Sequence, residues 1–229
     1  MIPQSLNITF DNTTNLDELF QTLKNNIIYI INITNYLLQQ VIVYKDHKHN
    51  YRLYAKIEFD YDIDSNITEE ITILAQHPSS IFGRSRDFLN PLKNTFNGYV
   101  KCIHIFNTTA IVTNSIDNIK PEDLNQDIHN YIIDLYYEIT IKWPIVILCC
   151  GQHIFSRSAL SKYIFRKYLL EFYTGFENIF LENISTKEYT INELKEYGLI
   201  KYPKCITPKY IKNIFSLWQN ERCKREEKI

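Results

Sequence analysis

Two stretches of the sequence repeat the same short order of residues, and this repetition limits the possible folds more than any other feature. Residues 71–77 (ITILAQH) and 145–153 (IVILCCGQH) are apolar, β-branched runs that both end in Gln-His. The first run is followed by IFGRS at residues 81–85, and the second leads into IFSRS at residues 154–158. Short apolar runs bounded by turn residues are typical of buried strands. The pattern therefore predicts two buried strands, each followed by a similar turn.

Each turn precedes a helix-like stretch, a glycine and a second strand-like run. The glycines are Gly98 in the first copy and Gly175 in the second, and glycine is common just after a helix. The second helical stretch is longer by about one turn, which a single insertion explains. We predict a duplicated unit of strand, turn, helix and strand over residues 69–106 and 143–181. In each copy, Ile-Phe would anchor the turn in the core and Arg-Ser would lie where the helix begins.

Hydrophobic spacing predicts the elements before the first copy. Apolar residues three and four positions apart indicate a helix from Leu16, capped by Thr14, whose far end at residues 26–34 could instead be a strand. Alternation of apolar and polar residues indicates a hairpin of residues 40–46 and 51–63.

Similar patterns predict the elements that follow, with turn residues as their boundaries. The later predictions are a helix capped by Asn90 with Pro91 as its first residue, a strand pair of residues 99–106 and 110–115, a helix from Pro121 that becomes a strand near residue 135, a helix at residues 158–175 and a strand at residues 176–184.

We predict an α+β fold, in which two related β-rich units follow an N-terminal helix and precede a C-terminal helical tail. The chain has 229 residues, of which 45% are hydrophobic, so it is long enough to bury a continuous core. No Gly/Ser-rich or Pro-rich linker divides it, and we expect a single compact chain. Within that chain, the first half covers residues 15–115, the second half covers 116–184 and the tail covers 185–229.

Composition argues against several functional classes. The 25 basic and 26 acidic residues give a formal net charge of −1, so no overall field favours nucleic acid or an anionic membrane. The N-terminus lacks the pattern of a signal peptide, and no apolar run approaches about 18 residues. The five cysteines form no Cys-x-x-Cys pair, and the 5 glycines form no phosphate-binding loop. We expect an intracellular protein of the nucleus or cytoplasm with reduced thiols, no membrane contact, no metal site and no cofactor.

Two arginines are candidate residues for binding nucleic acid or another anion. Arg84 and Arg157 lie in the two IFxRS turns, where a helix N-terminus would present free amides and a partial positive charge. Lys162, Arg166 and Lys167 extend the positive charge along the second helix. Alternatively, each serine caps its helix and each arginine is solvated or pairs with a carboxylate.

Cys150 and His153 are alternative candidates for catalysis, because a thiol near an imidazole can act as a nucleophile. Against this, Cys149 and Cys150 belong to an apolar run, where cysteine behaves as a small core residue. His77 and His153 hold matching places in the two copies, and His77-Pro-Ser79 is similar to the His-x-Ser/Thr pairs of two-histidine phosphoesterases. The second copy reads His-Ile-Phe and lacks the hydroxyl group.

A longer stretch around the second copy carries a resemblance to a known family. WPIVILCCGQHIFSRSALSKYIFRKYLLEF at residues 143–172 has a strand that begins near proline, then a turn and a helix, and EITILAQHPSSIFGRS at residues 70–85 looks like a divergent copy. This pattern resembles the CENP-L/CENP-N family of inner-kinetochore proteins and their yeast counterparts. The resemblance implies a non-enzymatic α+β scaffold that heterodimerises with a related subunit and offers a basic groove near centromeric DNA. The residues that it suggests for this groove are Arg157, Lys162, Arg166 and Lys167.

The leading hypothesis is a non-enzymatic scaffold or interaction protein of an intracellular complex. It would bind a protein partner, as a heterodimer or homodimer, through a sheet edge or through the tail, and could lie close to DNA. One alternative is a nucleic-acid- or phosphate-binding protein that uses the two Arg-Ser turns. Another is a thiol or phosphodiester hydrolase from an AT-rich virus or plasmid.

Overall fold

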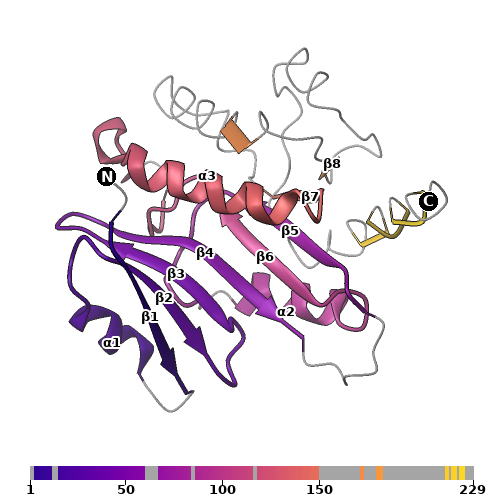
Figure 1. Cartoon of the computed structure of the whole chain (residues 1–229), viewed down its shortest axis with the longest axis horizontal. Coiled ribbons are helices and arrows are strands. Elements are labelled where there is room, and N and C mark those ends of the chain that lie inside the picture. The colour runs from indigo at the N-terminus through magenta and orange to yellow at the C-terminus, as the bar shows by residue number, and fades with distance from the viewer. Residues whose placement is uncertain are drawn as a thin grey trace.

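The structure, a computed structural model, describes most of the first 149 residues and short segments after them. The described residues are 3–11, 15–59, 67–83, 86–115, 118–149, 171–172, 179–182, 215–216, 218–220 and 222–224. The elements in chain order are β1 (Ser5–Phe10), α1 (Leu16–Thr22), β2 (Ile28–Ile33), β3 (Gln40–Lys45), β4 (Asn50–Glu58), β5 (Glu70–Ala75), α2 (Arg86–Phe96), β6 (Cys102–Asn107), the 3₁₀ helix η2 (Pro121–Asp123), α3 (Gln126–Thr140), β7 (Ile145–Cys149) and β8 (Ile179–Glu182) (Figure 1).

The strands form one mixed sheet in the order β1-β2-β3-β4-β6-β5-β7-β8. Neighbours from β2 to β6 pair antiparallel, whereas β6, β5, β7 and β8 are all parallel and β1 is parallel to β2. One half of the sheet is therefore largely antiparallel, and the other half is made of parallel strands that need crossover connections. This mixed sheet and its helices confirm the predicted α+β class.

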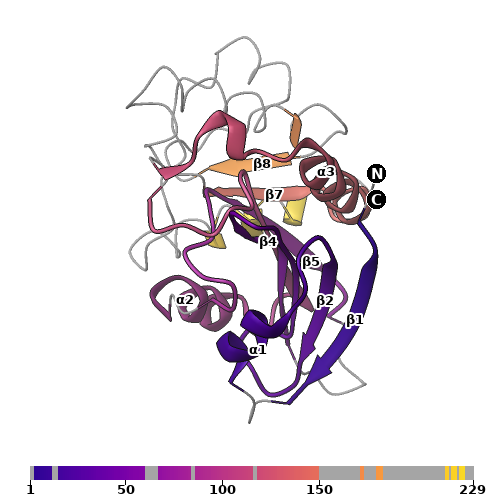
Figure 2. The same ribbon diagram turned by 90° about the vertical axis from the view of Figure 1, so that its left-hand side faces the viewer.

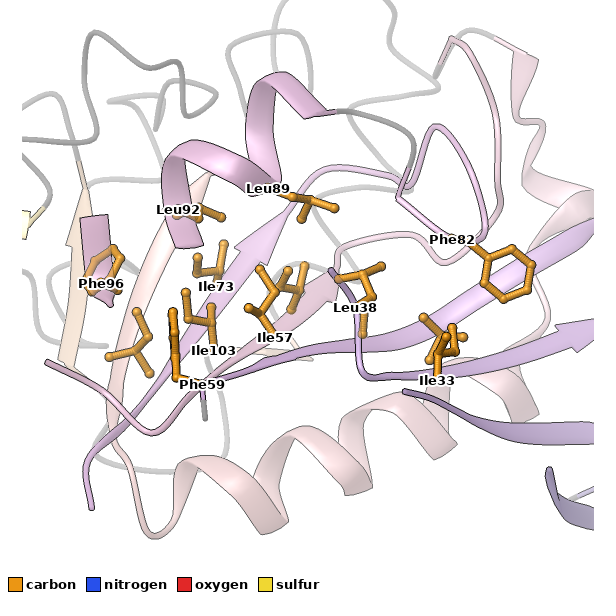
Figure 3. Packing of buried hydrophobic residues seen from close by; sticks show 14 of the residues in the cluster. Ile33, Leu38, Ile57, Phe59, Ile73, Phe82, Leu89, Leu92, Phe96 and Ile103 are labelled. Carbon is orange, nitrogen blue, oxygen red and sulfur yellow. The ribbon is translucent and has the colours of Figure 1, made fainter. Parts of the chain in front are cut away.

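Helices α1 and α2 cover one face of the sheet (Figure 2). α2 buries Leu89, Leu92 and Phe96, which lie three and four positions apart and so share one side of the helix. Figure 3 shows these side chains directed at the sheet, where Ile103 and other aliphatic residues meet them. Trp218 of the tail joins the same core, with its ring centroid 5.6 Å from that of Phe96.

Helix α3 covers the opposite face (Figure 2). It buries Ile128, Ile132 and Tyr136, which are spaced by about one turn and belong to the core on that side of the sheet. Phe172, from the connection between β7 and β8, packs on Tyr136 with ring centroids 4.9 Å apart. The described part of that connection therefore lies on the α3 side.

The parallel half of the sheet is wound outward from its centre. From β5 the chain passes through α2, on one face, to the neighbouring strand β6. From β7 it passes through Phe172, on the other face, to β8 on the opposite side. These two crossovers run in opposite directions and lie on opposite faces of the sheet. They therefore have the same hand, as connections between parallel strands require. The direction reverses between β5 and β7, whose last residues, Ala75 and Cys149, are register partners.

In the N-terminal region the structure decides between the two alternatives for residues 26–34 and differs from the prediction at two points. α1 ends at Thr22 and β2 begins at Ile28, so the strand alternative for residues 26–34 is correct. The cap of α1 is Asn15, one residue after the predicted Thr14, and its side chain accepts a hydrogen bond from a backbone N–H of the first turn. β1 was not predicted, although Leu6, Ile8 and Phe10 alternate with polar residues along this largely exposed edge strand. The predicted hairpin is confirmed as β3 and β4.

Helix α2 begins at Arg86, directly after the first Arg-Ser, so the prediction that a helix follows this turn is confirmed. The assignment of Asn90 as cap and Pro91 as first residue is wrong, because both lie inside the helix. An internal proline removes one helical hydrogen bond, and burial of the apolar face of α2 offsets that loss. Gly98 ends the helical region with φ +84°, the left-handed conformation expected of a terminating glycine.

Two predictions for the middle of the chain are wrong. Residues 110–115 form no strand, and the described residues there make one isolated bridge, between Tyr51 and Ile111. The reason is that β6 is a central strand, which already pairs with β4 on one side and β5 on the other. α3 continues to Thr140 instead of becoming a strand near residue 135. Its β-branched and aromatic residues face the sheet, and their burial outweighs a weak helix propensity.

The predicted duplication is not confirmed. β5 with β6 and β7 with β8 are both adjacent parallel pairs, as a repeated unit requires. Most of the second copy between β7 and β8 lies outside the described residues. In the first copy, Ile81 and Phe82 are buried in the core that α1 and α2 cover, as predicted for the anchor of the turn.

The predicted strand at residues 176–184 is present as β8. The predicted helix at residues 158–175 is described only at residues 171–172, which are helical. The tail is helical at its described residues between 215 and 224. The predicted boundaries between the two halves, at residue 115, and before the tail, at residue 184, stay predictions. β5 of the first half pairs with β7 of the second half, so one sheet extends across the boundary at residue 115.

Replacement of Gly83 with alanine tests how tightly the first turn is packed. Gly83 has φ +69°, and a Cβ atom there would lie 2.5 Å from Cδ1 of Leu89 and 2.8 Å from Cδ1 of Leu38. Both leucines are buried and have little room to move. We expect Gly83→Ala to lower the free energy of unfolding by about 2–4 kcal/mol, from backbone strain plus overpacking.

Gly98→Ala is the matched control for this substitution. Gly98 also has a positive φ, but a Cβ atom there meets nothing within 4 Å. Gly98→Ala should therefore lower the free energy of unfolding only through the strain of a positive φ at alanine, by about 1–2 kcal/mol. Urea unfolding followed by circular dichroism measures both changes. Equal losses for the two variants would contradict the packing of the turn described here.

Candidate anion-binding site

The carboxyl ends of the parallel strands meet at one edge of the sheet. Ala75 ends β5 next to Cys149 of β7 and next to Asn107 of β6. Because β5 and β7 lead to opposite sides, this edge is the topological switch point, where sheets of this kind bind their ligands. We name it the carboxyl edge and define it by Arg52, Gln76, His77 and residues 107–110.

Arg52, on β4, places a buried guanidinium group at the carboxyl edge. The residue is only 7% exposed. Its Nη1 donates to the carbonyl oxygen of Ser80 at 3.2 Å, and its Nη2 donates to Oδ1 of Asn107 at 3.3 Å. Its backbone N–H donates to the carbonyl oxygen of Ala110 at 2.9 Å. The guanidinium group is thus held by neutral acceptors.

The charge of Arg52 has no counter-charge among the described residues. The ion pairs formed by those residues do not include Arg52. Burial alone lowers the pKa of its guanidinium to about 10, so the group stays protonated at neutral pH. A buried charge without an opposite charge destabilises a folded protein. An anion bound here would remove that cost.

Buried polar atoms that lack a hydrogen-bond partner gather at the same edge. Folded proteins satisfy nearly all such atoms, so a group of them indicates that a partner from outside the chain belongs there. Arginine and amide nitrogens can only donate, and a hydroxyl can donate, so the partner they fit is an acceptor. The atoms without a partner among the described residues are Nε of Arg52, Nε2 of Gln76, Nδ1 of His77, Nδ2 of Asn107 and Oγ1 of Thr109.

One short segment holds these groups beside one another. The carbonyl oxygen of Gln76 accepts from Oγ1 of Thr108 at 2.7 Å and from the backbone N–H of Thr109 at 3.1 Å. The next residue, Ala110, accepts from the backbone of Arg52. Residues 107–110 therefore link the buried arginine on β4 to the end of β5.

A small pocket opens beside this segment, at the N-terminus of α3. Thr108 and Thr109 line one side of it, and Asn125 and His129 line another. His129 is already engaged, because its Nε2 lies 2.7 Å from Oε2 of Glu171. Of the residues that define the carboxyl edge, Thr108, Thr109 and Ala110 line this pocket, whereas Arg52, Gln76, His77 and Asn107 do not.

His77 also lies at the carboxyl edge, directly after Gln76. Burial lowers the pKa of its imidazole, so the ring is neutral at neutral pH and can donate or accept one hydrogen bond. Its predicted counterpart in a two-histidine phosphoesterase, His153, lies outside the described residues. That catalytic interpretation stays a prediction.

The residues predicted for anion binding, and those predicted for the alternative catalysis, lie outside the described residues. Cys149, which precedes one of them, is buried in the core under α2, which confirms its interpretation as a small core residue. α2 begins two residues after Arg84. The full set whose proposed roles stay predictions is Arg84, Arg157, Lys162, Arg166, Lys167, Cys150 and His153.

Sequence reasoning did not single out Arg52. A charged residue inside the otherwise apolar stretch YRLYA could have pointed to it, since a basic residue between buried neighbours needs a partner. It also did not single out the one group among the described residues that could hold a metal ion, Glu70, Cys102 and His104. That group lies at the opposite, amino ends of β5 and β6, and its members come from two strands, so no local spacing marks it.

Within the described ranges, none of the helices combines the length and the apolar character needed to cross a membrane. No protein-family model matches the chain, and neither a curated protein nor a solved structure matches it. The resemblance to the CENP-L/CENP-N family therefore stays a prediction.

Proposed function

We propose that the protein binds a small phosphate-bearing ligand at the carboxyl edge, where Arg52 neutralises the charge of the phosphate group. The observation that carries this proposal is the buried guanidinium of Arg52, which has no carboxylate partner among the described residues and an Nε without an acceptor. The planar guanidinium group matches phosphate oxygens in both geometry and charge. The side-chain amides of Gln76 and Asn107 each supply a further N–H donor.

A small ligand fits this site better than a nucleic acid. Nucleic-acid binding relies on many exposed Lys and Arg side chains that contact a row of phosphates. Here the formal net charge is −1 and the arginine is buried, so a single phosphate group is the natural counter-ion. The carboxyl edge of parallel strands is also where open α/β sheets bind phosphorylated small molecules.

Thermal unfolding in the presence of inorganic phosphate tests the proposal. A ligand that binds only the folded state stabilises it by about 2.7 kcal/mol at a concentration 100 times its dissociation constant. We expect the melting temperature to rise steadily with the logarithm of phosphate concentration once phosphate exceeds that constant. Sodium chloride at matched ionic strength is the control, because it screens charges equally but does not fit the site.

A panel of ligands then identifies the source of the phosphate group. Nucleoside monophosphates, a sugar phosphate and a single-stranded oligonucleotide are compared with inorganic phosphate. We expect the small ligands to stabilise the protein at least as strongly as phosphate does. A response confined to the oligonucleotide, and lost as salt rises, would favour the nucleic-acid alternative. The proposal is wrong if phosphate raises the melting temperature no more than chloride does and none of the small ligands raises it further.

The role of a scaffold or interaction protein stays a prediction. β1 is the edge of the sheet, and its residues are exposed or half-buried, with Leu6 among the exposed large apolar side chains. An edge strand of this kind is where a partner could add a strand. A small phosphate-binding site at the other half of the sheet is compatible with such a partner.

A further inference from the structure

Three side chains that can bind a metal ion lie together at the amino ends of β5 and β6. Glu70 is the first residue of β5, Cys102 is the first residue of β6, and the two are register partners. His104 follows two residues later on β6, so it shares a face with Cys102. The possible ligand atoms of all three lie within 4.8 Å of one another.

These ligand atoms converge on one nitrogen of the imidazole ring. Nε2 of His104 lies 2.7 Å from Oε2 of Glu70 and 3.2 Å from Sγ of Cys102. A Cys-His-acid catalytic triad needs the thiol at one ring nitrogen and the acid at the other. Here the thiol and the acid share the same nitrogen, which is unlike a triad and is the arrangement expected around a single ion.

The other ring nitrogen of His104 is occupied by an outer partner. Nδ1 lies 2.8 Å from the hydroxyl oxygen of Tyr54, on β4. When Nε2 binds a metal, Nδ1 must carry the proton and donate it, and a tyrosine oxygen can accept. Metal-bound histidines nearly always have such a partner on the second nitrogen, which fixes the ring orientation.

We propose that Glu70, Cys102 and His104 form a site for a single Zn²⁺ ion. One thiolate, one imidazole and one carboxylate are the ligands that Zn²⁺ takes in proteins, and three protein ligands leave a fourth position for water. Tetrahedral coordination would place the carboxylate oxygen about 3.4 Å and the sulfur about 3.6 Å from Nε2. Both separations are reached by side-chain movements of less than about 1 Å, and half-buried Glu70 gives the ion a way in from solvent.

The surroundings of this site suit a divalent ion. A metal ion bound here would replace the thiol proton of Cys102. Lys56 and Glu58 stand on β4 opposite His104 and Cys102, and they pair with each other at 3.2 Å. On the other side, Oγ1 of Thr72, the register partner of His104, is buried with no partner among the described residues.

This proposal does not depend on phosphate binding, because the two sites lie at opposite ends of the parallel strands. Arg52 and Asn107 are joined at the carboxyl edge, whereas Glu70 and Cys102 begin their strands. Loss of one site should leave the other intact. Either proposal can therefore fail while the other holds.

Titration of the chelator-treated full-length protein with Co²⁺ tests the metal site, because Co²⁺ replaces Zn²⁺ and reports its ligands by absorption. We expect one equivalent to give a thiolate-to-cobalt charge-transfer band in the near ultraviolet and tetrahedral d–d bands in the visible. Added Zn²⁺ should abolish both. Cys102→Ser should lose the charge-transfer band, whereas Cys223→Ser, which changes an exposed thiol, should keep it.

Tyr54→Phe is the variant that separates a metal site from a merely hydrogen-bonded cluster. It removes only the hydroxyl next to Nδ1 of His104, and loss of such an outer partner weakens metal binding by about 10–100-fold. The far-ultraviolet circular dichroism of each variant shows that it is folded. A band that persists in Cys102→Ser, no Co²⁺ binding by the unaltered protein, or equal affinity in Tyr54→Phe would overturn the proposal.

Discussion

Trp218→Ala is expected to lower the free energy of unfolding by about 3–5 kcal/mol, the cost of removing a fully buried aromatic side chain. Trp218 has no exposed surface and lies in the core formed with α2. Its ring centroid is 5.6 Å from that of Phe96 and 5.7 Å from that of Phe215. Arg222 stacks near the indole and pairs with Glu69 at 3.0 Å. Trp218 and Phe215 therefore anchor the described part of the tail to the core.

Urea unfolding measures this effect. Phe215→Ala is the matched control, because Phe215 packs against the same rings but is only partly buried, and it should cost clearly less. Trp143→Phe leaves Trp218 as the remaining tryptophan, so its fluorescence should shift toward longer wavelength in the unfolding transition. A loss of less than about 1 kcal/mol in Trp218→Ala would show that the tail does not pack as described.

Arg52→Met is expected to raise the free energy of unfolding by about 1–3 kcal/mol in a buffer without phosphate. Replacement of a buried charge by an apolar side chain of similar length is often stabilising. The gain in stability is limited, because the carbonyl oxygen of Ser80 and Oδ1 of Asn107 each lose the hydrogen bond that Arg52 donates to them. At saturating phosphate the unaltered protein should become more stable than Arg52→Met, because only the unaltered protein gains binding energy.

Arg222→Met is the control for this comparison. Arg222 is a partly exposed arginine whose partner is a carboxylate, so its loss should cost about 1 kcal/mol or less and leave the phosphate effect unchanged. A large loss of stability in Arg52→Met without phosphate would mean that Arg52 has a counter-charge within the chain. The argument for an external anion would then fail.

Much of the sheet could be predicted from the sequence. β3, β4, β5, β6, β7 and β8 were recognised, because alternating or continuous apolar runs reflect the burial of one or both faces of a strand. Element ends were less accurate where tertiary burial outweighs local preference. α2 includes Pro91, and α3 remains helical through β-branched residues, because in each case an apolar face is buried against the sheet.

The candidate sites could not be predicted, because residues distant in the sequence form them. Arg52 meets Ser80 and Asn107, which are 28 and 55 positions away. A bulge between Ile42 and Val43 also breaks the alternation of β4, so that Arg52 and Tyr54 face opposite sides of the sheet. Strict alternation would have placed them on the same face. Pairing register and bulges are properties of the folded sheet.

Calorimetric titration with inorganic phosphate tests the central claim most directly, when it is carried out on the unaltered protein, Arg52→Met and Arg222→Met. We predict saturable binding of one phosphate to the unaltered protein and to Arg222→Met. Arg52→Met should show no saturable heat although it is folded by circular dichroism. Unchanged phosphate binding by Arg52→Met, or no binding by the unaltered protein, would contradict the assignment of the carboxyl edge as a phosphate site.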